Sequence, residues 1–477
     1  MMTTQRLATL VTLAAMLAAC AHAPSADAPS APLSAQFKET PPGWIEAAPA
    51  DTLERGPWWS LFGDPVLDAL APKVEVSNQD IAAAAAAYAQ ARALVREQRA
   101  SLFPSLSLSG SASRSGGERA STSSAGGGGA SNNFQLDLGA SWEPDVWGRI
   151  GGAVSAAGAQ AQASAADLAA ARLSAQAEFV TDYLSLREAE AEATLLRSTI
   201  EGYSRSLQIA KNRYDAGVAP KSDVLQAQTQ LANAQADLAA LERQRGQLEH
   251  AMAVLSGQAP ADFRLPPGDW NATALPGVPL GLPSALLQRR PDIAAAERRV
   301  AAANAQIGVA RAAFFPSLTL SGNAGQGAAR IGDLFNASAF TWSLGVALAQ
   351  TLFDAGARSA RVDQARAGWE QSVAQYRQTV LGALQNVEDQ LVAARVLEQQ
   401  QALRRQASEA ADQTEQQVMN RYRAGQVGYT DVVSAQASAL SARRALIQAG
   451  AARQASAVAL IQALGGGWNA QSLASAH

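Results

Sequence analysis

The side chains that most often carry catalysis or hold metals are sparse in this sequence. Its histidines are His22, His250 and His477, and its single cysteine is Cys20. The histidines are too far apart in the sequence to indicate a metal cluster, and one cysteine cannot form a disulfide framework. We therefore expect no metal site and no cofactor.

A glycine-containing turn from Gly217 to Ser222 superficially resembles a phosphate-binding loop. It lacks the second glycine of that motif, and no strand is predicted before it, so a turn between two helices explains it better. The sequence also has no Gly-x-Ser-x-Gly nucleophile elbow. With no catalytic constellation, the sequence does not predict an enzyme.

Two carboxylates occupy matching places in the chain. Asp223 and Asp431 each follow a turn glycine, Gly217 or Gly425, by six residues. This position is about one turn into the next predicted helix, where a carboxylate can also simply stabilise the helix through its dipole.

The surroundings of Cys20 indicate a covalent modification. Arg6 precedes an apolar stretch from Leu7 to Leu17, which is typical of a secretory signal and too short to span a membrane. The segment Leu17-Ala18-Ala19-Cys20 resembles the bacterial lipobox, in which cleavage leaves the cysteine as a lipid-carrying N-terminus. The alternative is an ordinary signal peptide with an incidental cysteine.

The residues after Cys20 favour delivery to the outer membrane. Ala21 and His22 follow it, without the aspartate that retains enteric lipoproteins at the inner membrane. Residues 21–36 are rich in Ala, Pro and Ser and are predicted to form a flexible tether.

The chain repeats itself. The segment Phe103–Gly110 returns as Phe315–Gly322, displaced by 212, and Asn212-Arg213-Tyr214 returns as Asn420-Arg421-Tyr422, displaced by 208. The four-residue difference lies between Gly110 and Gly148, where an insertion marks an exposed loop tip. We therefore expect one body built from two equivalent halves.

Composition excludes several classes of protein. The 477 residues carry a net charge of −3 with no basic stripe, so nucleic acid is not an expected partner. Alanine is abundant and aromatic residues are few, which suits long helices packed through small side chains. No run of 18 apolar residues follows the N-terminus, so any membrane span would have to be built from strands.

Each half contains one predicted β-hairpin, over 103–143 and 315–350. Apolar and polar residues alternate in the second strand of each, over a length that spans a bilayer when tilted. A half-buried strand of a soluble sheet shares that period. The expected lipid-facing residues are Phe134, Leu136, Leu138, Trp142, Phe340, Trp342, Leu344 and Val346.

Four strands cannot close a barrel, and open strand edges are not tolerated in lipid. Several chains must therefore contribute. Two copies would give eight strands with a filled interior, and three would give twelve with room for a lumen.

Long helices follow the hairpins. No proline interrupts about Ala153 to Lys211 or Arg358 to Tyr422. The apolar spacing predicts coiled-coil seams. One seam contains Ala193, Leu196, Ile200, Tyr203, Leu207, Ala210 and Tyr214, and the other contains Val373, Tyr376, Val380, Leu384, Val387 and Leu391.

Shorter helices are predicted over 77–102 and 291–313 before the hairpins, and over about 221–256 and 429–464 after the turns. A short helix and a returning helix together match a long helix in length, so we expect them to stack end to end alongside it. The segments at these interruptions should form a belt, in which Trp58 and Trp59 pack on helices and do not form a ligand-binding box.

Several motifs together resemble the outer membrane factor family of TolC-like efflux channels. They are Trp58–Pro65, Leu282–Ile293, the two Phe-Pro-x-Leu-x-Leu-x-Gly segments and the paired Arg-Tyr-x-x-Gly turns. The lipobox resembles that of the NodT-type lipoprotein branch. The resemblance implies an α+β membrane protein, in which a duplicated helix–hairpin–long helix–helix unit builds a homotrimer. A twelve-stranded barrel in outer-membrane lipid would continue into a periplasmic α-helical barrel that docks on an adaptor protein and an inner-membrane efflux pump.

The resemblance also implies a gate at the periplasmic mouth. Asp431 matches a position that forms a carboxylate ring, and Tyr422 and Asp223 match positions that can bond across neighbouring helices to hold the mouth shut. Ser434 stands where the family frequently has a second Asp, so a double ring is not expected. Val427 replaces an arginine that sometimes adds a closing link. The turns, with Gly217, Val218, Gly425 and Gln426, are the expected adaptor contacts.

The expected organisation follows the repeat. It comprises a signal peptide (1–19), a lipidated tether (20–36), a belt segment (37–76), the first repeat (77–256, with its tip at 214–223), an equatorial linker (257–290), the second repeat (291–465, with its tip at 422–431) and a tail (466–477). A competing hypothesis is a lipid-anchored trimeric coiled-coil spacer or adhesin. It explains the seams and the lipobox, but not the paired amphipathic hairpins.

Overall fold

The computed structural model describes residues 36–39, 57–116, 130–268, 270, 289–336 and 340–468. The predicted signal peptide, Cys20, nearly all of the tether, and parts of the belt segment, linker and tail lie outside these residues. The chain divides into two compact units. The strand unit includes Tyr88–Ser164 and Ala296–Tyr376, and the helix unit includes Ala31–Ala87, Ala165–Ala295 and Arg377–His477.

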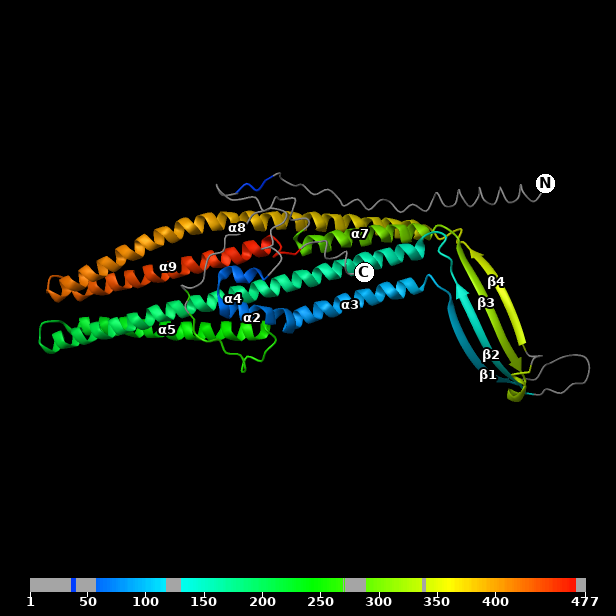
Figure 1. The fold of residues 1–477 in the computed structure, drawn as a ribbon, viewed down its shortest axis with the longest axis horizontal. Coiled ribbons are helices and arrows are strands. Elements are labelled where there is room, and N and C mark those ends of the chain that lie inside the picture. The colour runs from blue at the N-terminus through cyan, green and yellow to red at the C-terminus, as the bar shows by residue number, and fades with distance from the viewer. Residues whose placement is uncertain are drawn as a thin grey trace, which may run out of the picture. The chain divides into compact units, whose positions relative to one another are not determined.

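Both hairpins belong to one antiparallel sheet with the strand order β1-β2-β3-β4 (Figure 1). The strands are β1 (Ser105–Ser115), β2 (Ser131–Trp142), β3 (Ser317–Ala328) and β4 (Phe340–Ala349), with the short 3-10 helix η5 (Ile331–Asp333) before β4. Residues that pair directly across two strands point to the same face of the sheet. The register places the large apolar residues of all four strands on one face. One face is therefore mainly apolar and the other mainly polar.

The helices follow the predicted order in both halves. The short helices are α3 (Gln79–Ala100) and α7 (Pro291–Ala312), the long ones are α4 (Arg149–Asp215) and α8 (Ala357–Arg423), and the returning ones are α5 (Lys221–Leu255) and α9 (Tyr429–Ala463). Both long helices have 67 residues, and both returning helices have 35. None of the helices in the described part of the chain is apolar over a length that would cross a membrane.

Helix α4 begins four residues earlier than predicted because a side chain caps it. Asp145 accepts hydrogen bonds from Ile150 N (2.9 Å) and Gly151 N (2.6 Å), two of the amide groups that have no partner within the helix. The helix also ends four residues later than predicted, just before the turn at Gly217.

The predicted seams are largely confirmed. Ala193, Leu196, Tyr203 and Ala210 are buried, and the first three pack with Ala234 and other residues of α5. In the second seam, the buried residues are Val373, Tyr376, Val380, Val387 and Leu391. Tyr214, at the end of the first seam, is the exception, because 44% of it is exposed.

The belt segment contains a helix that the sequence analysis missed. Helix α2 (Pro65–Ser77) begins after Asp64, whose Oδ1 accepts from Val66 N at 2.8 Å and from Leu67 N at 3.2 Å. An aspartate cap followed by proline is a helix-start signal that could have been recognised. Just before it, the 3-10 helix η2 (Trp58–Phe62) places both tryptophans in the core, as predicted.

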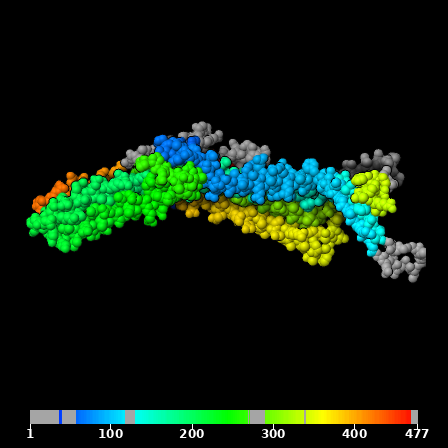
Figure 2. Space-filling model, turned by 90° about the horizontal axis from the view of Figure 1, so that it is seen from below, coloured from blue at the N-terminus to red at the C-terminus, as the bar shows by residue number. Residues whose placement is uncertain are grey.

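The short and returning helices meet end to end at two equivalent joints. Asn78 Nδ2 donates to Leu255 O, the last carbonyl of α5, at 3.0 Å. In the second half, Arg290 Nη1 donates to Ala463 O, the last carbonyl of α9, at 3.0 Å. In the space-filling view, the blue segment that contains α2 borders the green end of α5 (Figure 2). The predicted stacking of these helix ends is therefore found in both halves.

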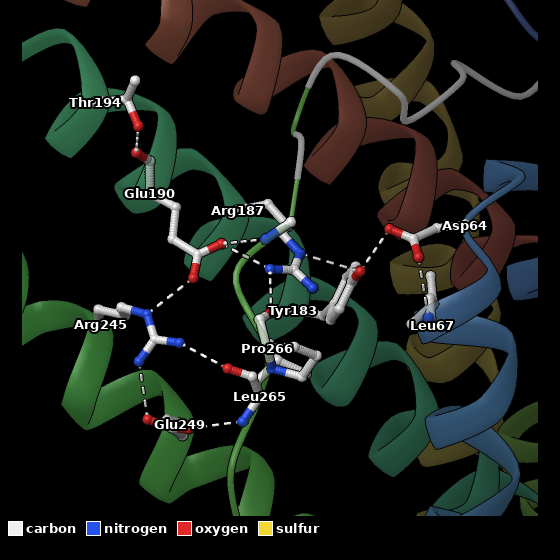
Figure 3. Close-up of polar contacts among 11 residues, drawn as sticks. Asp64, Leu67, Tyr183, Arg187, Glu190, Thr194, Arg245, Glu249, Leu265 and Pro266 are labelled. Atoms are coloured by element: carbon white, nitrogen blue, oxygen red, sulfur yellow. Dashed lines mark hydrogen bonds and ion pairs between the residues drawn. The ribbon is translucent and has the colours of Figure 1, made fainter.

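A partly buried ionic cluster holds the beginning of the linker (Figure 3). Arg187, only 1% exposed, donates to Glu190 Oε2 at 2.6 Å and to Pro266 O at 3.0 Å. Arg245 donates to Glu190 Oε1 at 2.8 Å, to Glu249 Oε2 at 3.0 Å and to Leu265 O at 2.8 Å. We call Arg187, Glu190, Arg245 and Glu249 the linker clamp, because they join α4 and α5 to residues 265 and 266.

Loss of the shared carboxylate in the clamp should destabilise the protein. In Glu190→Gln, both arginines lose their common negative partner, and Arg187 keeps a buried charge with less compensation. We expect the free energy of unfolding to fall by about 3–5 kcal/mol. Denaturant unfolding of the detergent-solubilised protein measures the change.

Glu201→Gln is the matched control. Glu201 lies on the same helix and faces Arg205 at 4.0 Å, but both side chains are more than 70% exposed. This variant should change stability by less than about 1 kcal/mol. Equal effects of the two substitutions would show that the clamp contributes no more than a surface ion pair.

Candidate functional site

The two helical hairpins of the helix unit turn in the same way at their tips. Gly217 and Gly425 have φ values of +75° and +73°, a conformation that glycine adopts without steric cost. Val218 N donates to Arg213 O and Gln426 N donates to Arg421 O, each at 2.9 Å, which closes the ends of α4 and α8. The predicted adaptor-contacting residues Gly217, Val218, Gly425 and Gln426 are all exposed on these turns.

Beside these turns, an apolar cluster joins the two hairpins. It consists of the buried residues Ala210, Ala227, Tyr422, Tyr429 and Val432, which come from α4, α5, α8 and α9. The Tyr422 and Tyr429 rings pack edge to face with centroids 5.4 Å apart. Burial raises the pKa of the Tyr429 phenol to about 12, so this hydroxyl stays protonated at neutral pH.

Arg213 adds a charged contact between the hairpins. Its guanidinium carbon lies 4.8 Å from the centroid of the Tyr422 ring, and Nη1 donates to Tyr422 O at 3.4 Å. A guanidinium over a tyrosine face is attracted by the electron density of the ring. Arg213 on α4 therefore makes a contact with α8. Arg213 belongs to the first repeat, whereas the arginine that Val427 replaces would belong to the second repeat.

The predicted hydrogen bond between Tyr422 and Asp223 is not made in this single chain. The Tyr422 hydroxyl is buried, and it has no hydrogen-bond partner among the described residues. Burial is the main cause that raises the pKa of this phenol; the Arg213 charge lowers it, and the Asp223 charge raises it. The ring itself is held by Tyr429 and Arg213.

Equivalent residues of the two repeats have different environments at the tips. Tyr422 is 3% exposed, whereas its equivalent Tyr214 is 44% exposed. Arg213 lies on Tyr422, whereas its equivalent Arg421 is exposed. The first repeat therefore supplies the arginine of the contact and the second repeat supplies the tyrosine.

The predicted gate carboxylates lie in the first turns of the returning helices, Asp223 in α5 and Asp431 in α9. Asp223 is partly buried and Asp431 is exposed. The exposed Ser434 donates its hydroxyl to Thr430 O at 2.9 Å, so its own helix occupies that donor. Because both carboxylates lie at helix N-termini, stabilisation through the helix dipole remains an alternative role.

The sheet exposes a large apolar face. Phe340, Trp342, Leu344 and Val346 are 52–80% exposed, and on the neighbouring strands Leu138 is 48% exposed. Phe134, Leu136 and Trp142 share this face through the pairing register but are partly covered. Exposed apolar surface of this extent on a strand unit indicates contact with a hydrophobic surrounding. Within the described ranges, no group of three or more His, Cys, Asp or Glu side chains could hold a metal ion.

The family model described as outer membrane efflux protein matches residues 70–258 and 282–466. The two matches begin 212 residues apart and end 208 apart, the same displacements that relate the repeated motifs.

Individual relatives align over nearly the whole chain. The antibiotic efflux pump outer membrane protein ArpC of Pseudomonas putida is 34% identical over 98% of this chain and 97% of its own length. The pyoverdine export outer membrane protein OpmQ of Pseudomonas aeruginosa is 31% identical over 96% of each chain. The solved structure of the Neisseria gonorrhoeae MtrE outer membrane channel in its open state is similar with a TM-score of 0.83, at 28% identity over 94% of this chain and 98% of that one. The chain therefore belongs to the outer membrane efflux protein family.

Proposed function

We propose that this protein is the outer-membrane exit channel of a tripartite efflux system. It is a passive conduit for small molecules, and it docks on a periplasmic adaptor protein and an inner-membrane pump. The observation that carries the proposal is the four-stranded sheet, which has an apolar exposed face and two hairpins that each lead into a 67-residue helix. Family membership supports a channel and not an enzyme.

The edges of the sheet support a homotrimer. β1 pairs only with β2, and β4 pairs only with β3, within the described strands. Lipid offers no hydrogen bonds to the remaining edge groups, so these edges must pair with other copies of the chain. Three copies supply twelve strands, which enclose a lumen, and lipid on Cys20 would add membrane affinity to such a barrel.

The names of the relatives support small molecules as the cargo. ArpC is named for antibiotics and OpmQ for pyoverdine. A wide water-filled tunnel discriminates only loosely by size and charge, so the pump and adaptor would choose among such solutes.

The helical tips form the gate in this proposal. Three-fold symmetry would place three copies of Asp431 around one axis at the mouth, with Asp223, Tyr422 and Ser434 close by along the same tips. The turns with Gly217, Val218, Gly425 and Gln426 would meet the adaptor. The alternative, a coiled-coil spacer or adhesin, would have the same helices but would conduct no ions.

The first prediction concerns assembly. We expect the detergent-extracted protein to be a trimer without a stable folded monomer, because the strand edges are satisfied only in the assembly. Native mass measurement and planar-bilayer recording test this together. A folded monomer, or a trimer without channel conductance, would contradict the proposed function.

The second prediction concerns charge at the mouth. Asp431→Ala should lower the preference for cations over anions and weaken block by multivalent cations applied from the periplasmic side, because the carboxylate ring attracts them. Asp68→Ala is the control, since Asp68 is an exposed carboxylate on α2 and not at the tip. If both variants keep the selectivity and block of the unmodified channel, the constriction does not contain Asp431.

The third prediction concerns the contact between the hairpins. Arg213→Gln should raise the opening frequency, because it removes a cation–π contact worth about 0.5–2 kcal/mol in each chain. Tyr422→Phe keeps the aromatic ring under Arg213 and removes only the hydroxyl. It should raise the opening frequency only if the Tyr422 hydroxyl bonds Asp223 in the assembly. Single-channel recording measures both variants.

The equivalent arginine provides the control for this comparison. Arg421→Gln removes the same charge from the matching position of the other tip, where the side chain is exposed. It should leave the opening frequency unchanged. An equal increase for Arg213→Gln and Arg421→Gln would mean that general loss of positive charge, and not the stacked contact, controls opening.

A further inference from the structure

The polar face of the sheet carries one ionisable side chain. In the described strands this face consists of Ser, Thr, Asn, Gln, Gly and Ala residues, together with Asp137 near the middle of β2. The other ionisable residue of the strands, Arg114, lies on the opposite face near the end of β1. An ionisable residue within a membrane-spanning segment is costly unless it faces water, and it commonly marks a solute pathway.

The neighbouring strand makes room for this carboxylate. Asp137 pairs with Gly325 of β3, which is buried. A Cβ atom at Gly325 would overlap the Asp137 carboxylate and lie 3.1 Å from Leu136 O. Gly325 is not in the left-handed region, so its backbone does not require glycine. Glycine is needed there for space, because the Asp137 side chain lies across it.

The surroundings of Asp137 are polar but do not neutralise it. Its other partner across the ladder is Ser109 of β1, and Gly325 is followed in the same row by Thr341 of β4. No salt bridge joins Asp137 to another residue in the parts of the chain that the structure describes. The negative charge of Asp137 is therefore not compensated by a cationic side chain, and it can act on solutes in front of the polar face.

We propose that Asp137 and its copies form a carboxylate ring inside the barrel, which favours the passage of cationic solutes over anionic ones. The proposal rests on the proposed function, since the trimeric barrel turns the polar face toward a common lumen. This ring would be a second ring of negative charge. It lies on strand β2, whereas Asp431 lies at the helical tips. The class of solute that it favours includes metal cations and protonated amines.

The range of the effect depends on salt. The Debye length is about 30 Å at 0.01 M and about 3 Å at 1 M ionic strength. Carboxylates on the wall of a twelve-stranded barrel can therefore act across the lumen in dilute salt but not in concentrated salt. Ion selectivity that depends on Asp137 should disappear at high ionic strength.

The test is the reversal potential of the full-length channel in planar bilayers under a potassium chloride gradient. Asp137→Asn should lower the permeability ratio of K⁺ to Cl⁻ by about twofold or more in dilute salt and leave it unchanged near 1 M. The comparison is repeated after Asp431→Ala has been added both to the unmodified protein and to Asp137→Asn, so that the charge at the tips does not mask the result.

A second variant tests the same ring without touching Asp137. Ser109→Lys places a positive charge directly opposite the carboxylate on β1 and should lower the ratio in the same way, whereas Ser109→Asn adds bulk without charge and should not. An unchanged ratio in both Asp137→Asn and Ser109→Lys overturns this inference alone. Absence of any conductance in the unmodified protein overturns the proposed function, and this inference with it.

Discussion

The need to pair the edges of a four-stranded sheet governs the architecture of this protein. β1 and β4 each have one strand partner within the described chain, and their apolar face is exposed. Each unpaired amide or carbonyl group costs several kcal/mol in lipid. The chain is therefore complete only as part of an assembly, and the duplicated helices that follow the hairpins must be compatible with the same symmetry.

Duplication gives two similar hairpin tips, but the structure uses them differently. Tyr422 is buried under Arg213, while Tyr214 and Arg421, their equivalents in the other repeat, are exposed. A contact that takes one residue from each repeat links the two hairpins of one chain. The contact between Arg213 and Tyr422 therefore adds to the apolar cluster that joins the two hairpins.

Much of the fold could be predicted from the sequence, because strand and helix periods are local. The two hairpins, the long helices and most of the seam residues from Ala193 to Ala210 follow from residue spacing. Contacts between distant segments could not be predicted in this way. Arg187 and Arg245 meet residues 265 and 266, and Arg213 meets Tyr422, only because long helices take one particular axial alignment. The periodicity of a seam allows several such alignments, and the resemblance pointed to Asp223 as the partner of Tyr422, not to Arg213.

The two helix joints differ in chemistry although they occupy equivalent positions. Asn78 closes one joint as a neutral donor, while Arg290 closes the other as a cation that Asp292 holds at 2.7 and 3.0 Å. Ionic strength screens the partly exposed pair of Arg290 and Asp292 but leaves a buried amide bond nearly unaffected. We therefore expect a change in ionic strength to act on the joint at Arg290 more than on the joint at Asn78. The difference at one repeated position, Asn78 in the first half and Arg290 in the second, gives one joint that we expect to depend little on salt concentration and another that we expect to depend on it more.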